Sequence, residues 1–363
     1  MSKYVGLLTA AGLACLPVMA SAAPTLTEVL GASGVTLDGY ISGGYTYGFN
    51  DGRALGGRAF DTVTDSFDLN QAAFTLSKLP AQGAGGVVNV IAGEDAKIIN
   101  GAYGDAPGSA DNIAVTQAYL QYATGGLTIM GGRFVTLAGA EVINDTANAN
   151  ISRGFLFTGV QPLVHTGVRA AYKAGSTTWY GGLSNAAFTV AGSPDLDTQK
   201  TLELGAAFAP SSASSLAVTG YYSPDNGGPT DTDWLLDVVF SAQLSDMTQF
   251  VLNADYRSSD FGTSDDQVIW GLAAYGNFKL SDANRLSLRG EYVDISDAGG
   301  AAGADNDVQS LTLTFGHKVV ANLELLGEVR WDMSDADIFP DTGAAGGVED
   351  SQGDVAIKAI YKF

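Results

Sequence analysis

Apolar and polar residues alternate with a period of two along most of this chain, and the pattern does not change to a helical period after residue 35. In the clearest segment, one face carries Trp234, Leu236, Val238 and Phe240, and the opposite face carries Asp233, Asp237 and Ser241. Segments 250–257 and 285–292 show the same division. Successive side chains of a strand point to opposite faces of a sheet, so the pattern predicts an all-β fold.

The polar faces carry more charges than a packed protein interior tolerates, but they suit a water-filled lumen. Beyond residue 22, no apolar run approaches the roughly 20 residues that a membrane-spanning helix needs. The sequence therefore predicts a transmembrane up-and-down antiparallel β-barrel, with lipid against the apolar face of each strand. A soluble β protein with a buried core is the alternative.

Short and long links alternate along the chain, as the two ends of an up-and-down barrel require. The short links lie near 78–85, 123–126, 173–176, 210–214, 244–247, 280–283 and 318–322. The long links lie near 50–66, 97–113, 136–160, 186–200, 223–232, 258–266, 294–307 and 333–352. They predict about 16 strands, within a range of 14 to 18, each of about 9 to 11 residues, with short periplasmic turns and long extracellular loops.

The N-terminus has the features of a secretory signal peptide over residues 1–22. Lys3 precedes an apolar stretch from Val5 to Met19, and Ala20-Ser21-Ala22 supplies small residues before a cleavage point. We expect Sec-type export, a short periplasmic segment over residues 23–34, and a barrel over residues 35–363 in the outer membrane. Within the short segment, Thr25 to Leu30 can form one or two helical turns before Gly31.

The last strand is the most specific local signal. Apolar residues occupy alternate positions up to the terminal Phe363, at Val355, Ile357, Ala359 and Tyr361. A C-terminal strand of this kind resembles the signature that the outer-membrane barrel assembly machinery recognises. We therefore expect that machinery to be a partner of this chain.

Composition excludes several function classes. The only cysteine, Cys15, lies in the predicted signal peptide, so neither disulfides nor thiolate sites are available to the mature chain. Two histidines limit catalysis and metal binding, and we expect no enzyme activity, no cofactor and no metal site. Removal of Lys3 takes the formal net charge from −21 to −22, which excludes nucleic acid as a natural partner.

Five short stretches, mainly in the first half of the mature chain, resemble the OmpL-like β-barrel porins (porin-2 type). They are Val35-Thr36-Leu37-Asp38-Gly39-Tyr40, Gln117-Ala118-Tyr119, Gly132-Arg133-Phe134, Asn150-Ile151-Ser152-Arg153 and His165-Thr166-Gly167-Val168-Arg169. The resemblance implies a channel without a defined substrate. It also implies that loop 136–160 folds inward and narrows the pore, as the corresponding loop does in 16-stranded porins. Arg153 would then face carboxylates across a constriction.

Ten charged residues share the polar strand faces or belong to the motifs around the longest loop, and we expect them to line the pore. They are Arg133, Arg153, Arg169, Asp237, Asp255, Arg257, Arg289, Glu291, Glu328 and Arg330. Opposite charges on facing strands can hold a transverse field across a lumen, although many such pairs are only structural.

The predicted function is passive diffusion of small hydrophilic solutes or ions through an outer-membrane porin, because a barrel of about 16 strands leaves an aqueous channel. The eight long links contain 23 acidic and 5 basic residues, which predicts a weak cation preference. Lipid, lipopolysaccharide and two further copies of the chain, in a homotrimer, are the other expected partners. The alternatives are a non-conducting surface protein, such as an adhesin or receptor, and a transporter of hydrophobic solutes.

Overall fold

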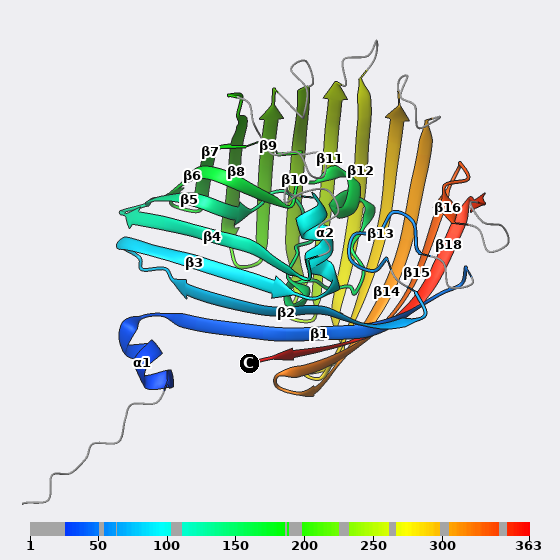
Figure 1. The fold of residues 1–363 in the computed structure, drawn as a ribbon, viewed down its shortest axis with the longest axis horizontal. Coiled ribbons are helices and arrows are strands. Elements are labelled where there is room, and N and C mark those ends of the chain that lie inside the picture. Colours follow the sequence, from blue (N-terminus) through cyan, green and yellow to red (C-terminus); the bar gives the residue numbers. More distant parts are fainter. Residues whose placement is uncertain are drawn as a thin grey trace, which may run out of the picture.

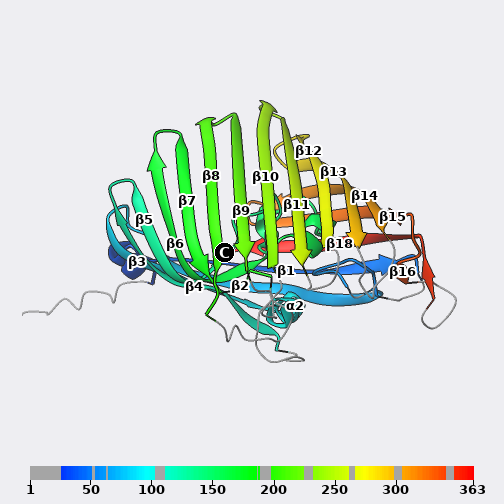
Figure 2. The same ribbon diagram turned by 90° about the horizontal axis from the view of Figure 1, so that it is seen from above.

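The computed structural model describes residues 26–50, 54–62, 64–102, 111–185, 187–188, 198–224, 232–260, 266–297, 305–340 and 347–363. In these residues, sixteen strands form one closed antiparallel barrel in which neighbours in the sequence are neighbours in space (Figures 1 and 2). The predicted signal peptide lies outside the described residues. None of the described helices has the length and apolar character needed to cross a membrane.

The first half of the wall consists of β1 (Thr36–Gly48), β2 (Ser66–Lys78), β3 (Gly83–Ala92), β4 (Ile113–Thr124), β5 (Leu127–Val135), β6 (Val164–Ala174), β7 (Thr177–Ser184) and β8 (Thr201–Ser211). The second half consists of β9 (Ser214–Ser223), β10 (Thr232–Ser245), β11 (Thr248–Asp260), β12 (Gln267–Lys279), β13 (Asn284–Asp297), β14 (Asn306–Val320), β15 (Leu323–Ser334) and β18 (Ser351–Lys362). The hairpin of β16 (Phe339–Pro340) and β17 (Val348–Glu349) belongs to the last long loop.

The predicted alternation of short and long links is confirmed. Each short link joins two wall strands; for example, β4 ends at Thr124 and β5 begins at Leu127. The predicted range of strand lengths, about 9 to 11 residues, was too narrow, because the strands range from 8 residues in β7 to 15 in β14. The longer strands continue their backbone ladders well past the length that a membrane alone requires.

The outer face of the barrel is apolar, as the alternation predicted. Leu120 is 76% exposed and Ile357 is 60% exposed, whereas Asp237 and Arg330, which face the inside, are fully buried. Aromatic side chains form a row near the long-loop end of neighbouring strands, where Trp234 stacks on Tyr256 with ring centroids 5.0 Å apart. Such rows lie at the interface between lipid and water in transmembrane barrels.

The N-terminal helix is longer than predicted. Helix α1 (Leu26–Ser33) continues past Gly31, which we expected to follow its end. It ends at Ser33, and the next residue, Gly34, adopts a left-handed φ of 66° that allows the Val35 amide to donate back to the Leu30 carbonyl at 3.3 Å. Figure 1 shows α1 at the start of β1, beyond the strands of the barrel.

The two ends of the wall meet where β1 pairs with β18. Beyond the last strand, Phe363 and Gly39 exchange backbone hydrogen bonds of 2.9 and 3.1 Å. The Phe363 ring lies directly over Gly39 and contacts Phe74, at a centroid distance of 5.6 Å. A β-carbon at position 39 would overlap this ring, so glycine lets the terminal side chain lie where it does and any other residue would require the ring to shift.

The inside of the barrel contains packed apolar residues as well as charges. Helix α2 (Glu94–Ala102) lies against β2, β3 and β4 (Figure 1), and its residues Ala96 and Ile99 are fully buried. They join one cluster with Phe60 and Phe157, which come from two different loops. A second cluster includes Leu156 and Tyr275, against β9–β13. Loops therefore fill part of the lumen.

Candidate functional site

The loop between β5 and β6, residues 136–163, crosses the inside of the barrel; we call it the inner loop. Asp145 accepts a hydrogen bond from Ser42 of β1 at 2.6 Å. Elsewhere in the loop, Ala140 N donates to Asn253 of β11 at 3.0 Å, and Asn150 donates to Thr314 of β14 at 2.6 Å. These strands lie on different sides of the wall, so the predicted inward fold of this loop is confirmed.

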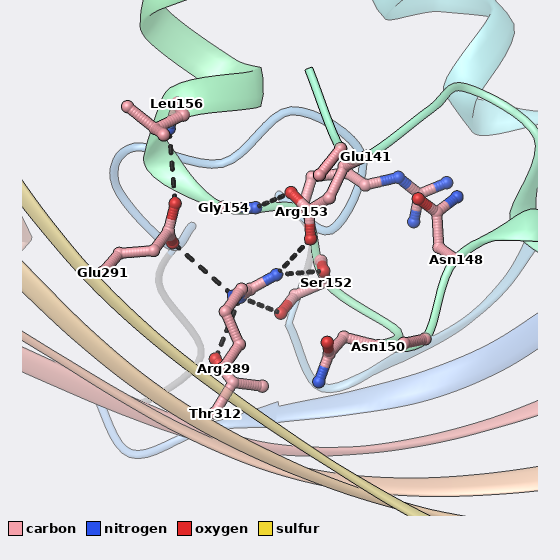
Figure 3. A network of polar contacts seen from close by, with 12 residues as sticks. Glu141, Asn148, Asn150, Ser152, Arg153, Gly154, Leu156, Arg289, Glu291 and Thr312 are labelled. Carbon is pink, nitrogen blue, oxygen red and sulfur yellow. Dashed lines mark hydrogen bonds and ion pairs between the residues drawn. The ribbon is translucent and has the colours of Figure 1, made fainter. Parts of the chain in front are cut away.

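Arg289 of β13 is the main attachment of the inner loop to the wall (Figure 3). Its Nη1 donates to Glu141 Oε1 at 2.7 Å and to the Ser152 carbonyl at 2.8 Å. Its Nη2 donates to the Ser152 hydroxyl at 3.1 Å and to Thr312 at 2.9 Å. The guanidinium is fully buried and thus holds two separate parts of the loop against β13 and β14.

Wall carboxylates complete this attachment by accepting hydrogen bonds from the loop backbone. Glu328 accepts from the amides of Ile151 and Ser152 at 2.6 and 2.9 Å. Glu291 accepts from the amides of Phe155 and Leu156 at 3.1 and 3.4 Å. The wall charges therefore satisfy backbone groups that the loop could not otherwise bury.

The prediction that Arg153 faces carboxylates across a constriction was wrong, because its side chain binds within its own loop. Its Nη2 is 2.8 Å from Asp145 of the same loop. The three guanidinium nitrogens also donate to three backbone carbonyls within residues 142–151. The rings of Phe60 and Phe157 flank the guanidinium at 5.5 and 5.8 Å. A loop arginine can satisfy its donors locally, so Arg153 stabilises the shape of the inner loop and is buried.

Asp145 is the second charged anchor of the loop, through Lys358 of β18 at 3.1 Å. Burial acts to raise the pKa of Asp145, but Lys358 and Arg153 outweigh it and hold the pKa at about 2. In contrast, burial and the neighbouring Asp145 raise the pKa of Asp95 in α2 to about 8. At neutral pH the Asp145 carboxylate is therefore charged, and the Asp95 carboxyl is largely protonated.

The other predicted wall residues also lie in close pairs, which are buried apart from Arg257, whose side chain is 17% exposed. Arg169 and Glu203 form a bidentate pair with both distances 2.6 Å. Arg257 pairs with Asp233 at 2.5 Å and Arg330 with Asp332 at 2.7 Å. Asp237 and Asp255 face each other across β10 and β11, and the inner loop's Gln161 donates to Asp255 at 2.7 Å.

Arg133 is the exception among the ten predicted residues, because its ladder partners Ala118 and Thr166 place it on the opposite face of β5 from Phe134 and His165. Phe134 and His165 are buried inside the barrel. Strict alternation along β5 decides this facing. The glycine-rich sequence of β5 has no clear apolar face from which it could be predicted.

Several buried charges were missed by sequence reasoning. Glu203 and Asp332 have the same inward position as the predicted residues, and a complete count of alternation along each strand would have found them. Asp233, which alternation placed on a polar strand face but which was not among the ten predicted residues, is also buried. Arg58 lies in the first long loop and is also buried. No local sequence signal marks the burial of Arg58 against the wall, because its two wall partners are 274 and 296 positions away.

A cavity of about 500 Å³ opens beside the tip of the inner loop at the short-turn end. Its lining includes Gln249, Asn277, Lys279, Arg285, Lys318 and Lys362. The cavity has basic, acidic and amide side chains, which suit hydrated polar solutes rather than apolar ones. The lining of this cavity includes none of the ten predicted residues.

The sequence from residue 34 to 363 matches the family model described as "Putative beta-barrel porin-2, OmpL-like". No curated protein matches the chain. Among solved structures, the outer membrane channel DcaP of Acinetobacter baumannii is 15% identical with a TM-score of 0.62, over 91% of this chain and 97% of that one.

Two further structures have the same TM-score of 0.62 and also cover 91% of this chain and 99% of their own. They are the trimer form of OmpT of Vibrio cholerae, 14% identical, and an anion-selective porin from Comamonas acidovorans, 12% identical. At these identities the likeness establishes the fold of a 16-stranded porin.

Proposed function

Because the chain belongs to the OmpL-like β-barrel porin-2 family, we propose that it forms an outer-membrane channel for passive diffusion of small hydrophilic solutes or ions. Family and fold point to a channel rather than an enzyme. The finer proposals are a narrowed lumen and a weak preference for cations.

The attachment of the inner loop to the wall is the observation that carries this proposal. Arg289, Glu291 and Glu328 hold the loop across the lumen through buried, charge-assisted hydrogen bonds. Such bonds are about twice as strong as neutral ones, so they resist the loop's movement out of the barrel. A loop held in this way leaves a narrower path than the bare wall would, which restricts passage to small solutes.

Single-channel recording in a planar bilayer tests the proposal. We expect discrete current steps in KCl from protein that shows the heat-dependent gel mobility of a folded barrel. Folded protein that inserts and gives no current would contradict the channel function. Boiled protein, which loses the barrel, is the control for contaminating channels.

A non-conducting surface protein is the second candidate, and one observation favours it. The apolar clusters around Phe60, Phe157 and Leu156 fill part of the lumen, as a plug would. Swelling of liposomes in solutes of increasing size separates the two functions. A porin admits the smaller solutes, whereas a plugged barrel admits none of them.

We also propose the assembly and location that this function requires. These are cleavage after Ala22, insertion by the barrel assembly machinery through the strand that ends at Phe363, contact with lipopolysaccharide, and a homotrimer. The trimer form of OmpT supports the last proposal by likeness of fold. Chemical cross-linking of the folded protein in outer-membrane fragments tests it, since a trimer gives products at two and three times the monomer mass and none that is larger.

A further inference from the structure

The first long loop also enters the barrel, through Arg58. This side chain is completely buried. Its Nη2 lies 3.0 Å from Asp332 of β15 and 2.5 Å from Asp354 of β18, and its Nη1 lies 2.5 Å from Asp61 of its own loop. The guanidinium therefore sits between two carboxylates that belong to adjacent strands of the wall.

The wall supplies more than these two ion pairs. Gln352 of β18 donates to Asp332 at 2.9 Å, and its side chain binds both the amide and the carbonyl of Gly56, at 2.9 and 2.8 Å. The second carboxylate oxygen of Asp354 is buried and has no hydrogen-bond partner among the described residues. We call Asp332, Gln352 and Asp354 the acidic socket; it has acceptor capacity that Arg58 does not use.

Charge balance shows what the acidic socket requires. Among the described residues of this cluster, Asp61, Asp332 and Asp354 are paired with Arg58 and Arg330, while the nearby Lys358 is paired with Asp145. Without Arg58, two wall carboxylates would share only Arg330. A buried carboxylate that has lost its cation is strongly unfavourable, so an empty acidic socket would attract another cation.

The geometry of the acidic socket selects a particular kind of cation. One Nη atom reaches carboxylates on two strands, and the other reaches a third carboxylate. A planar guanidinium, with five donors in a fixed arrangement, matches such an array better than an ammonium group does.

We propose that the acidic socket is a recognition site for solutes that carry a guanidinium group, and that Arg58 occupies it as a tethered substitute in the resting channel. The inference rests on the proposed channel function, for which it names a substrate class. A soluble guanidinium compound would displace Arg58 and release the first loop from the lumen. Gly57, directly before Arg58, is exposed, and Asp61, the third carboxylate that Arg58 contacts, lines a cavity of about 110 Å³.

The first test measures binding to folded Arg58→Ala protein in detergent, with L-arginine and, as matched control, L-citrulline, which has a similar shape but no charge. We expect L-arginine to raise the unfolding temperature of this variant in a saturable manner. We expect no such rise with L-citrulline, or with either ligand when Asp332→Asn and Asp354→Asn are added. An equal response to both ligands, or none to L-arginine, would overturn the proposal.

The second test uses the native arginine and does not depend on how well Arg58→Ala folds. The predicted mature chain has no cysteine, so Ala59→Cys introduces a single thiol at a position that is only 6% exposed. We expect L-arginine, but not L-citrulline, to increase the rate of thiol labelling several-fold as Arg58 leaves the acidic socket. An unchanged labelling rate at saturating L-arginine would show that Arg58 is only a structural anchor.

Both tests are independent of ion conduction, so their failure is distinguishable from failure of the channel proposal. A protein that passes KCl but shows neither response keeps its channel function and loses the guanidinium site. Conversely, binding without current would leave the acidic socket in place and favour a receptor.

Discussion

At the scale of single residues, Arg289 makes three of its four hydrogen bonds to the inner loop. We predict that Arg289→Ala loosens this loop and changes single-channel conductance or ion selectivity. Removal of one partner from a buried ion pair costs about 3 to 5 kcal/mol, because Glu141 and Glu291 keep their charge without a cation. The backbone ladder of β13 is untouched, so the heat-resistant gel mobility should persist.

Arg169→Ala is the matched control for this prediction. Arg169 also belongs to a buried wall pair, but its side chain donates to Glu203 of β8 and to the Val135 carbonyl of β5 rather than to residues 141–156. An equal change in current from both variants would show that Arg289 has no special role. Loss of folding in Arg289→Ala without a channel effect would favour a purely structural role.

The low pKa of Asp145 indicates that the inner loop is loosened only at strongly acidic pH. Its pKa, held at about 2, lies below its ordinary value of 3.8, so its ion pairs contribute fully above pH 3.8. That contribution is lost as the pH falls through about 2. We therefore predict that current fluctuations increase between pH 4 and pH 2, and that Asp145→Asn shows similar fluctuations at pH 7. A pH-independent current in both proteins would contradict the prediction.

At the scale of elements, the inner loop offers the most direct test of constriction. We predict that deletion of residues 141–150 raises single-channel conductance, because it removes Glu141, Asp145 and the tip of the loop from the lumen. Conductance is compared only for deletion protein that keeps the heat-dependent gel mobility of a folded barrel. Unchanged conductance from such protein would mean that the inner loop does not limit the path.

The contact of Phe363 with Gly39, at the seam where β1 pairs with β18, should affect assembly of the barrel. We predict that Phe363→Ala and Gly39→Val both lower the yield of assembled barrel in the outer membrane. The first removes the terminal ring, and the second fills the space in which the ring lies. The control is Phe208→Ala, which removes an aromatic ring that is 45% exposed and lies on β8, away from the seam in the strand order. Equal yields from all three variants would count against this role of the ring.

At the scale of the whole molecule, the distribution of charge predicts ion preference. The eight long links carry 23 acidic and 5 basic residues, a net −18 of the mature −22. A rim of one sign concentrates cations within about 10 Å at 0.1 M salt. We predict a modest cation preference that fades as ionic strength rises, measured as reversal potentials in KCl gradients. An anion preference at low salt without divalent ions would contradict it.

Divalent cations provide the competing arrangement for the same rim. Ca²⁺ or Mg²⁺ could link these carboxylates to neighbouring lipopolysaccharide and neutralise them. In that arrangement, Mg²⁺ abolishes the cation preference at low salt. If Mg²⁺ has no effect, the carboxylates act as free charges at the mouth.

The wall of this barrel could be predicted from sequence because strand facing and link length are local properties. Alternation between Asp237 and Val238, or between Arg289 and Leu288, requires only that successive side chains point to opposite faces. A short link such as Gly125–Gly126 likewise specifies that its two strands are antiparallel neighbours. Strand number, inward charges in β10–β15 and the terminal strand followed from these rules.

The contents of the lumen were decided only by the tertiary structure. Alternation identifies Arg330 as inward, but it does not show that the inner loop covers it or that Arg153 binds within its own loop. Arg58 meets Asp332 and Asp354 because a loop from the start of the chain packs against its last strands. Those pairings depend on which buried charges remain to be neutralised once the loops are packed, and no local sequence pattern contains that information.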